Sequence, residues 1–282
     1  MPVDRPTVPP PVEFRQSVSL GAKNMFYRQT LERLLEAGDI ARSDRVVVFC
    51  GGYNDAQILS ELAFSDITIT NLDPRKESNV RGLKWEFQDA ENPTYADGQF
   101  DVAIVHAGLH HCHSPHRALL QMYRVARKAV IAFEARDSVA MRIARVAGFT
   151  PDFELEAISN EGYETGGVAN GPIPNFIYRW TEREVTKTIR SFDPAHVEKI
   201  KYFYGLDLPT LRLEKTNAGA RRTAMKILAP AARLFTLLFP KQGNRFGFAV
   251  IRTGQLRDWL EIKDGKVRLS REKAERLGQA YS

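Results

Sequence analysis

The 282-residue sequence has only two cysteines, Cys50 and Cys112, which is too few for a disulfide framework and is typical of a reducing compartment. It contains no run of about 18 apolar residues, so we expect no helix that crosses a membrane. The first residues include no apolar stretch of the signal-peptide kind. We therefore expect a cytoplasmic protein, and a composition of 43% hydrophobic and 26% charged residues indicates an ordinary globular fold.

Charge is distributed unevenly along the chain. Residues 199–282 contain 18 Lys and Arg against 7 Asp and Glu, whereas residues 1–198 have an acidic excess. A basic C-terminal third favours an anionic substrate, a membrane surface or nucleic acid as partner, and a solvated basic face explains it equally well. No nucleic-acid-binding module is visible, so we expect no nucleic acid partner. The oligomeric state is not predicted.

Three segments are expected. Five of the first eleven residues are proline, which predicts an extended arm over residues 1–20. Residues 21–254 are expected to form one domain, with a core at 44–136 and cap insertions at about 137–180 and 207–245. Residues 255–282 read as a charged tail that is helical in part.

Apolar, β-branched runs alternate with helical patterns through the expected domain. The alternation predicts an α/β fold with crossover connections, because parallel strands are joined by helices that cover both faces of the sheet. We expect a doubly wound, mostly parallel, seven-stranded Rossmann-like sheet with an added cap or lid. Its predicted strands are residues 45–52, 66–73, 82–90, 100–108, 128–135, 197–206 and 246–253.

A glycine turn, CGGYND, follows the first predicted strand at the edge where open α/β sheets bind ligands. Gly51 and Gly52 lack the third glycine of a dinucleotide fingerprint, so a tight turn without a ligand explains them as well. Asp73 ends the second strand, where a carboxylate can accept ribose hydroxyl groups. Asp89 and Ala90 end the third strand, where a carboxylate beside a backbone N–H can contact an adenine edge.

Four stretches in order, VVVFCGGYND, TNLD, QDAENPTYADGQFDVAIVHAGLHH and RVARKAVIAFEA, span roughly residues 44–136. Together they resemble the successive motifs of class I S-adenosylmethionine-dependent methyltransferases of the small-molecule type. The resemblance implies S-adenosyl-L-methionine as cofactor. It also implies cofactor contacts from Gly51 and Gly52 (methionine), Asp73 (ribose), Asp89 and Ala90 (adenine) and His106.

The sequence departs from the family pattern at three positions. Val48 stands where the family usually has an acidic residue, and Cys50 and Asn54 replace glycines of the glycine-rich motif. We expect Asn54 and Asp55 to supply the polar contacts to the amino-acid end of the cofactor.

Five of the six histidines lie in HAGLHHCHSPH, residues 106–116. Histidine and cysteine are common zinc ligands, but the spacing matches no known metal motif and the run has no carboxylate, so we expect no metal. A hydroxyl acceptor must lose a proton, and histidine suits that task. We expect His110 or His111 to be the catalytic base, and His113 and His116 to be surface groups.

We therefore predict a methyltransferase that acts on a hydroxyl of a small molecule, such as a sugar, a polyketide or a lipid-linked metabolite. The loop after the fourth strand lacks the Asn/Asp-Pro-Pro-aromatic motif of enzymes that methylate base and amide nitrogens, which favours oxygen. Two alternatives stay open. One is a non-catalytic cofactor-binding or scaffold protein, because the glycine motif is altered; the other is an NAD(P)-dependent oxidoreductase, which Asp73 alone permits.

A basic and apolar segment at residues 219–239 is predicted to be helical and is interrupted by Pro230. It favours peripheral contact with a membrane, or else packing of its apolar side against the sheet or the acceptor pocket. We expect residues 137–180 and the basic C-terminal third to select the acceptor. The glycine-rich stretch within 137–180 can form a lid, and the positive charge of the C-terminal third would attract an anionic or lipid-linked acceptor.

Overall fold

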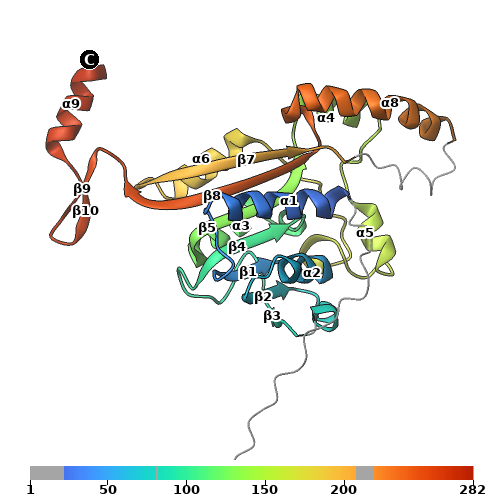
Figure 1. The fold of residues 1–282 in the computed structure, drawn as a ribbon, viewed down its shortest axis with the longest axis horizontal. Helices are drawn as coiled ribbons and strands as arrows, with labels where there is room; N and C mark the ends of the chain where they lie inside the picture. Colours follow the sequence, from blue (N-terminus) through green and yellow to red (C-terminus); the bar gives the residue numbers. More distant parts are fainter. Residues whose placement is uncertain (1–21, 81, 208–218, 282) are drawn as a thin grey trace, which may run out of the picture.

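The computed structural model describes residues 22–80, 82–207 and 219–281, and the arm expected at residues 1–20 lies outside these ranges. A central sheet has the strand order β3-β2-β1-β4-β5-β8-β7, with the short β6 beside β5 (Figure 1). The predicted doubly wound, mostly parallel sheet is confirmed, and β6 is a strand that the sequence pattern did not indicate. The strands are β1 (Arg45–Phe49), β2 (Asp66–Asn71), β3 (Lys84–Phe87), β4 (Phe100–His106), β5 (Ala126–Arg136), β6 (Arg179–Trp180), β7 (His196–Gly205) and β8 (Arg245–Leu256).

The direction of each strand follows from its connection. Strands β1 to β5 run parallel. Helical segments join β1 to β2 (α2, Tyr53–Glu61), β2 to β3 (the 3₁₀ helix η1, Pro74–Val80) and β4 to β5 (α3, Pro115–Val125), whereas residues 88–99 join β3 to β4 without a helix. The late strand β8 lies antiparallel to both β5 and β7. The carboxyl ends of β1, β2, β3 and β4 therefore meet at one edge of the sheet.

Alternate side chains of each buried strand enter one of two cores. In β1, Val46 and Val48 pack on the face covered by α1 (Ala22–Glu36) and α2, whereas Val47 and Phe49 pack on the face covered by α3 and α6 (Glu182–Phe192). Successive side chains of a strand point to opposite faces, so an uninterrupted apolar run is what a strand covered on both sides requires. The run VVVF is therefore the sequence signal of its central position.

Residues 137–180 form a mixed segment at the carboxyl edge of the sheet. It contains α4 (Val139–Val146), α5 (Leu155–Asn160) and the 3₁₀ helix η3 (Val168–Asn170), and its last residues form β6. An isolated bridge pairs Phe153, before α5, with Phe176, after η3, and joins the two ends of the stretch between them. This segment supplies the cover of the cavity described below.

In the late part of the chain, the long helix that precedes β8 lies beside α4 (Figure 1). Helix α8 (Gly219–Leu238) contains Pro230 and is followed by the 3₁₀ helix η4 (Pro240–Gln242). A hairpin of β9 (Leu260–Lys263) and β10 (Lys266–Leu269) and the terminal α9 (Arg271–Tyr281) extend away from the sheet (Figure 1). Among the residues that the structure describes, no helix is both long enough and apolar enough to cross a bilayer.

Candidate active site

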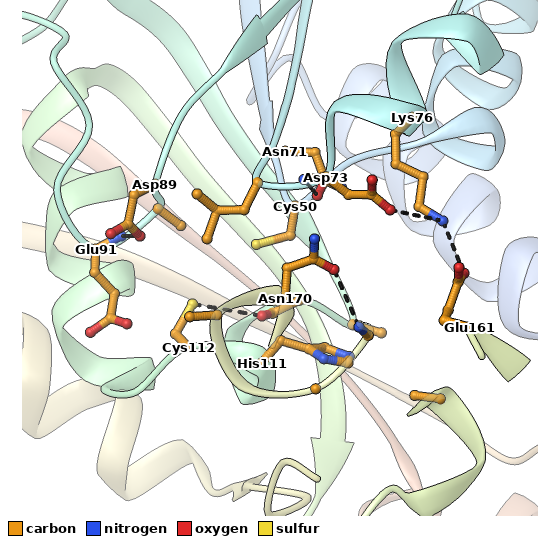
Figure 2. A pocket seen from close by; sticks show the side chains of 18 of the residues that line it. Cys50, Asn71, Asp73, Lys76, Asp89, Glu91, His111, Cys112, Glu161 and Asn170 are labelled. Carbon is orange, nitrogen blue, oxygen red and sulfur yellow. Dashed lines mark hydrogen bonds and ion pairs between the residues drawn. The ribbon is translucent and has the colours of Figure 1, made fainter. Parts of the chain in front are cut away.

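A cavity of about 340 Å³ lies at the carboxyl ends of β1 to β4, beneath a cover formed by residues 154–170, of which residues in the range 157–170 line the cavity. Figure 2 shows its polar side chains converging from the strand ends on one side and from this cover on the other. Its labelled lining residues are Cys50, Asn71, Asp73, Lys76, Asp89, Glu91, His111, Cys112, Glu161 and Asn170. Ligand cavities of this kind combine a largely preformed shape with a few polar groups that orient the ligand.

The turn after β1 is held close to the loop after β4. Cys50 has a positive φ of 52°, and the N–H of Gly51 donates to the carbonyl of Thr70 at 2.8 Å. A Cβ atom at Gly108 would lie 2.5 Å from the Cβ of Cys50, so only glycine permits this approach. Cys50 and Gly108, which both line the cavity, are therefore in direct contact and form its floor.

Asp73 projects from the end of β2 and is 3% exposed. Its carboxylate accepts hydrogen bonds from the Arg75 guanidinium, from Nε to Oδ1 and from Nη2 to Oδ2, both at 2.8 Å. These bonds outweigh the effect of burial and lower the pKa of Asp73. Asn71 orients the same turn, because its Oδ1 accepts from the Asp73 N–H and its Nδ2 donates to the Gly51 carbonyl. An ionised carboxylate at a strand end is the group that ribose hydroxyls need.

Asp89 and Ala90 lie in the turn after β3 and line the opposite end of the cavity. Asp89 Oδ1 accepts from the Glu91 N–H at 2.8 Å. The carboxylate of Glu91 in turn accepts from the N–H groups of His113 and Ser114 at the start of α3. The turn after β3 is therefore tied to the loop after β4, and Asp89 and Ala90 are fixed at the cavity.

Ion pairs fasten the cover to the neighbours of Asp73. Glu161 contacts Arg75 Nη2 at 3.0 Å and Lys76 Nζ at 3.3 Å, and Lys76 lies 3.7 Å from Asp73 (Figure 2 shows the Lys76 contacts). Arg75 also donates to the hydroxyl of Thr165 at 2.8 Å. These contacts close the cavity over the strand ends.

Beside the cavity, His110 is buried between two carboxylates. Its Nδ1 lies 2.7 Å from Glu134 Oε2 and its Nε2 lies 3.2 Å from Glu154 Oε2. Burial alone would lower the pKa of His110, but the two carboxylates outweigh it and raise the pKa to about 9. The same contact with His110 lowers the pKa of Glu154 to about 2.

His111 differs from its neighbour because it faces the cavity. Its Nε2 lies 3.5 Å from Glu154 Oε2, and its ring lies 4.6 Å from that of His110, centroid to centroid. Burial and the positive charge of His110 lower the pKa of His111. The ligand atoms of His110, His111 and Glu154 all lie within 4.8 Å of one another, so this set is also able to hold a metal ion.

Of the expected cofactor residues, Asp73, Asp89 and Ala90 line the cavity. Gly51 is buried against Val48 and Ile69, and the Gly52 N–H donates to Asp55 Oδ2 at 3.0 Å, which caps α2. The remaining expected residues also lie outside the lining: Asn54 is exposed, Asp55 is buried beside Tyr27, and His106 packs against the rings of Tyr27 and Phe133.

Two site residues were not singled out from the sequence. Glu134 lies inside a predicted strand, where the sequence pattern indicates only an interruption of an apolar run. Glu154 lies in the cap segment, 44 residues after His110. The histidine run itself contains no carboxylate, and the fold brings one carboxylate to His110 from each of these distant segments.

Residues 49–133 match the family model described as a methyltransferase domain. Among solved structures, one described as a methyltransferase from Bacillus halodurans C-125 is 12% identical; the match covers 79% of this chain and 97% of that one, with a TM-score of 0.50. A chain from the complex of the Haloferax volcanii Trm112 methyltransferase activator with a methyltransferase is 14% identical; the match covers 82% and 92%, with a TM-score of 0.50. No curated protein matches the sequence.

Residues 49–133 thus match a methyltransferase domain, and the fold is that of class I S-adenosylmethionine-dependent methyltransferases, whose cofactor is S-adenosylmethionine. The cavity fits this cofactor, because it presents carboxylates at the ends of β2 and β3 beside a close turn after β1.

Proposed function

We propose that the chain transfers the methyl group of S-adenosylmethionine to a hydroxyl of a small molecule. Asp73 would hold the ribose, and Asp89 with the Ala90 N–H would flank the adenine. The observation that carries the proposal is a proton-handling cluster of His110, His111 and Glu154 at the wall of the cofactor cavity. Such a cluster is needed when the acceptor carries a proton that must leave, as a hydroxyl does.

The bound cofactor supplies an electrophilic methyl group, so that the acceptor oxygen gains a bond to carbon while the bond from that carbon to sulfur breaks. The chain would align donor and acceptor, and the imidazole of His111, which lines the cavity, would accept the hydroxyl proton. Glu134 holds His110 from behind and would keep the cluster in place. The cover, fastened by Glu161, would keep water from the sulfonium.

The experiment is to incubate the purified chain with cofactor labelled at the methyl group and an extract of its source cells. The labelled product is then isolated, and the atom that carries the methyl group is identified by nuclear magnetic resonance. We expect an O-methyl product. A product methylated only on nitrogen or carbon would contradict the proposal while leaving the methyltransferase assignment intact.

We further propose that the acceptor is lipid-linked and met at a membrane surface, which the exposed apolar side chains of α8 and α4 support. Leu234, Leu237 and Leu238 are 59%, 77% and 65% exposed on α8, and Val146 is 85% exposed on α4. The two helices are connected through η4, because the Ala140 N–H donates to Gln242 Oε1 at 3.1 Å. Apolar side chains next to a basic chain segment are typical of interfacial elements.

Co-sedimentation with vesicles of phosphatidylcholine and phosphatidylglycerol tests this surface. We expect binding that Leu237→Ser with Leu238→Ser reduces several-fold. No binding, or equal binding by the double variant, would restrict the proposal to a water-soluble acceptor.

A further inference from the structure

Three metal-ligating atoms converge at the wall of the cavity. His110 and His111 belong to the 3₁₀ helix η2 (Leu109–His111) after β4, and Glu154 immediately precedes α5 in the cover. Both histidine Nε2 atoms approach the same carboxylate oxygen, Glu154 Oε2, at 3.2 and 3.5 Å. The arrangement therefore brings two imidazole nitrogens and one carboxylate oxygen within 4.8 Å of one another.

The spacing fits a metal ion. Ligand atoms bound tetrahedrally at about 2.0–2.1 Å lie roughly 3.3–3.4 Å apart, and the two measured contacts lie on either side of that value. Two histidines and one carboxylate are a recurrent ligand set of catalytic zinc sites and of non-haem iron sites. In such sites three protein ligands leave one or more positions open for a reactant.

The surroundings of the histidines also fit. A metal-bound histidine usually donates its other ring N–H to a carboxylate or a backbone carbonyl, which fixes the ring and its tautomer. Glu134 does this for His110: its Oε2 lies 2.7 Å from Nδ1, while its Oε1 accepts from the N–H groups of Gly108 and Leu109. The Glu134 side chain is fully buried, so the outer contact is rigid.

We propose that His110, His111 and Glu154 bind a divalent transition-metal ion, with an open position directed into the cavity. The existence of the site stands on geometry alone, whereas its role rests on the proposed function. The open position would take the acceptor hydroxyl, and the positive charge would favour loss of its proton to solvent rather than to His111, whose Nε2 would then hold the ion. Methyl transfer would then proceed as written above, with the metal neither oxidised nor reduced.

The site also explains a structural feature of the cover. Glu154 belongs to the cover and the histidines belong to the strand wall, so a bound ion would join the two walls of the cavity at the acceptor end. The Asn175 amide lies 3.4 Å from Glu154 Oε2 and holds that carboxylate from the cover side. The ion would thus complement the Glu161 ion pairs, which fasten the cover at the cofactor end.

The test is calorimetric titration of the chelator-treated full chain with ZnCl₂, checked by metal analysis of the protein as purified. We expect one saturable site per chain. Glu154→Gln and His111→Ala should each weaken zinc binding at least about tenfold, and Glu134→Gln by about 10–100-fold. His113→Ala is the matched control, because this exposed histidine belongs to the same run and should leave zinc affinity unchanged. Circular dichroism establishes that each variant is folded.

Absence of saturable zinc binding would overturn the proposal, as would equal loss from His113→Ala and Glu154→Gln. Methyl transfer is measured on the same preparations, so the two proposals can fail separately. Full O-methylation by metal-free protein would retain the proposed function and refute the metal's role. Tight zinc binding lost in Glu154→Gln, together with exclusive N-methylation, would retain the metal site and refute the proposed function.

Discussion

The two walls of the cavity are built in different ways. The strand wall consists of short turns after β1, β2, β3 and β4, and neighbouring strands hold each turn in place. The cover, residues 154–170, consists of the short helices α5 and η3 and the turns between them, and it is fastened by ion pairs from Glu161 and by Glu154. On the proposed function, the strand wall would hold the cofactor and the separately attached cover would contact the acceptor, so that the acceptor could change while the cofactor site is kept.

The largest effect is expected where the two walls meet. His111→Ala should lower kcat by about 10²–10⁴-fold. The substitution removes the one member of the His110, His111 and Glu154 cluster that lines the cavity, where the acceptor proton must leave. Affinity for S-adenosylhomocysteine should change less than about threefold. Steady-state kinetics and calorimetry measure the two quantities, with His113→Ala as the control. Equal losses of kcat in His111→Ala and His113→Ala would sink the assignment.

The strand wall depends on close backbone packing at some glycines and not at others, and Gly108 and Gly52 are an example of each. A Cβ atom at Gly108 would lie 2.5 Å from Cys50 Cβ and 2.9 Å from Val105 Cγ2, whereas one at Gly52 would meet nothing within 4 Å. Gly108→Ala should therefore destabilise the fold by about 1–3 kcal/mol. Gly52→Ala should shift stability much less. Urea unfolding of both variants checks the difference, and equal midpoints would contradict the packing described.

Cofactor affinity should depend on pH through Asp73. Hydrogen bonds from Arg75 lower the pKa of Asp73 below its ordinary value of about 3.9, so the carboxylate stays ionised through the neutral and mildly acidic range. Affinity for S-adenosylhomocysteine should be flat from about pH 8 to 5 and fall only as the pH approaches the lowered pKa. In Arg75→Ala the pKa of Asp73 rises, so the decline should begin at a higher pH. Coincident profiles of the two proteins would argue against this role of Arg75.

The smallest effect concerns the fastening of the cover. Glu161→Gln removes ion pairs to Arg75 and Lys76, whose side chains are 55% and 34% exposed. Partly exposed pairs contribute about 0.2–1 kcal/mol, so cofactor affinity should fall no more than about fivefold. Hydrogen exchange should show faster exchange over residues 157–170 and no change in β1 to β4. Faster exchange in the strands would mean that the walls are not independent.

The same contrast explains what could be predicted from the sequence. The sheet and the positions of Asp73 and Asp89 were predictable, because each depends on a strand and the turn that directly follows it. Gly51 and Asp55 were expected at the cofactor, but the structure uses them for packing and for capping α2. Glu154 could not be predicted, because it meets His110 only through the tertiary path of the cover, which has no periodic pattern.

The central claim is that the cavity at the ends of β1 to β4 binds S-adenosylmethionine through Asp73. Calorimetric titration of the full chain with S-adenosylhomocysteine, and separately with NAD⁺ and NADH, tests it most directly, with Asp73→Ala as the variant. We predict saturable binding of S-adenosylhomocysteine at one site per chain, weakened at least about tenfold in Asp73→Ala, and no binding of the nicotinamide cofactors. Binding of a nicotinamide cofactor instead, or undiminished S-adenosylhomocysteine binding by Asp73→Ala, would contradict the account.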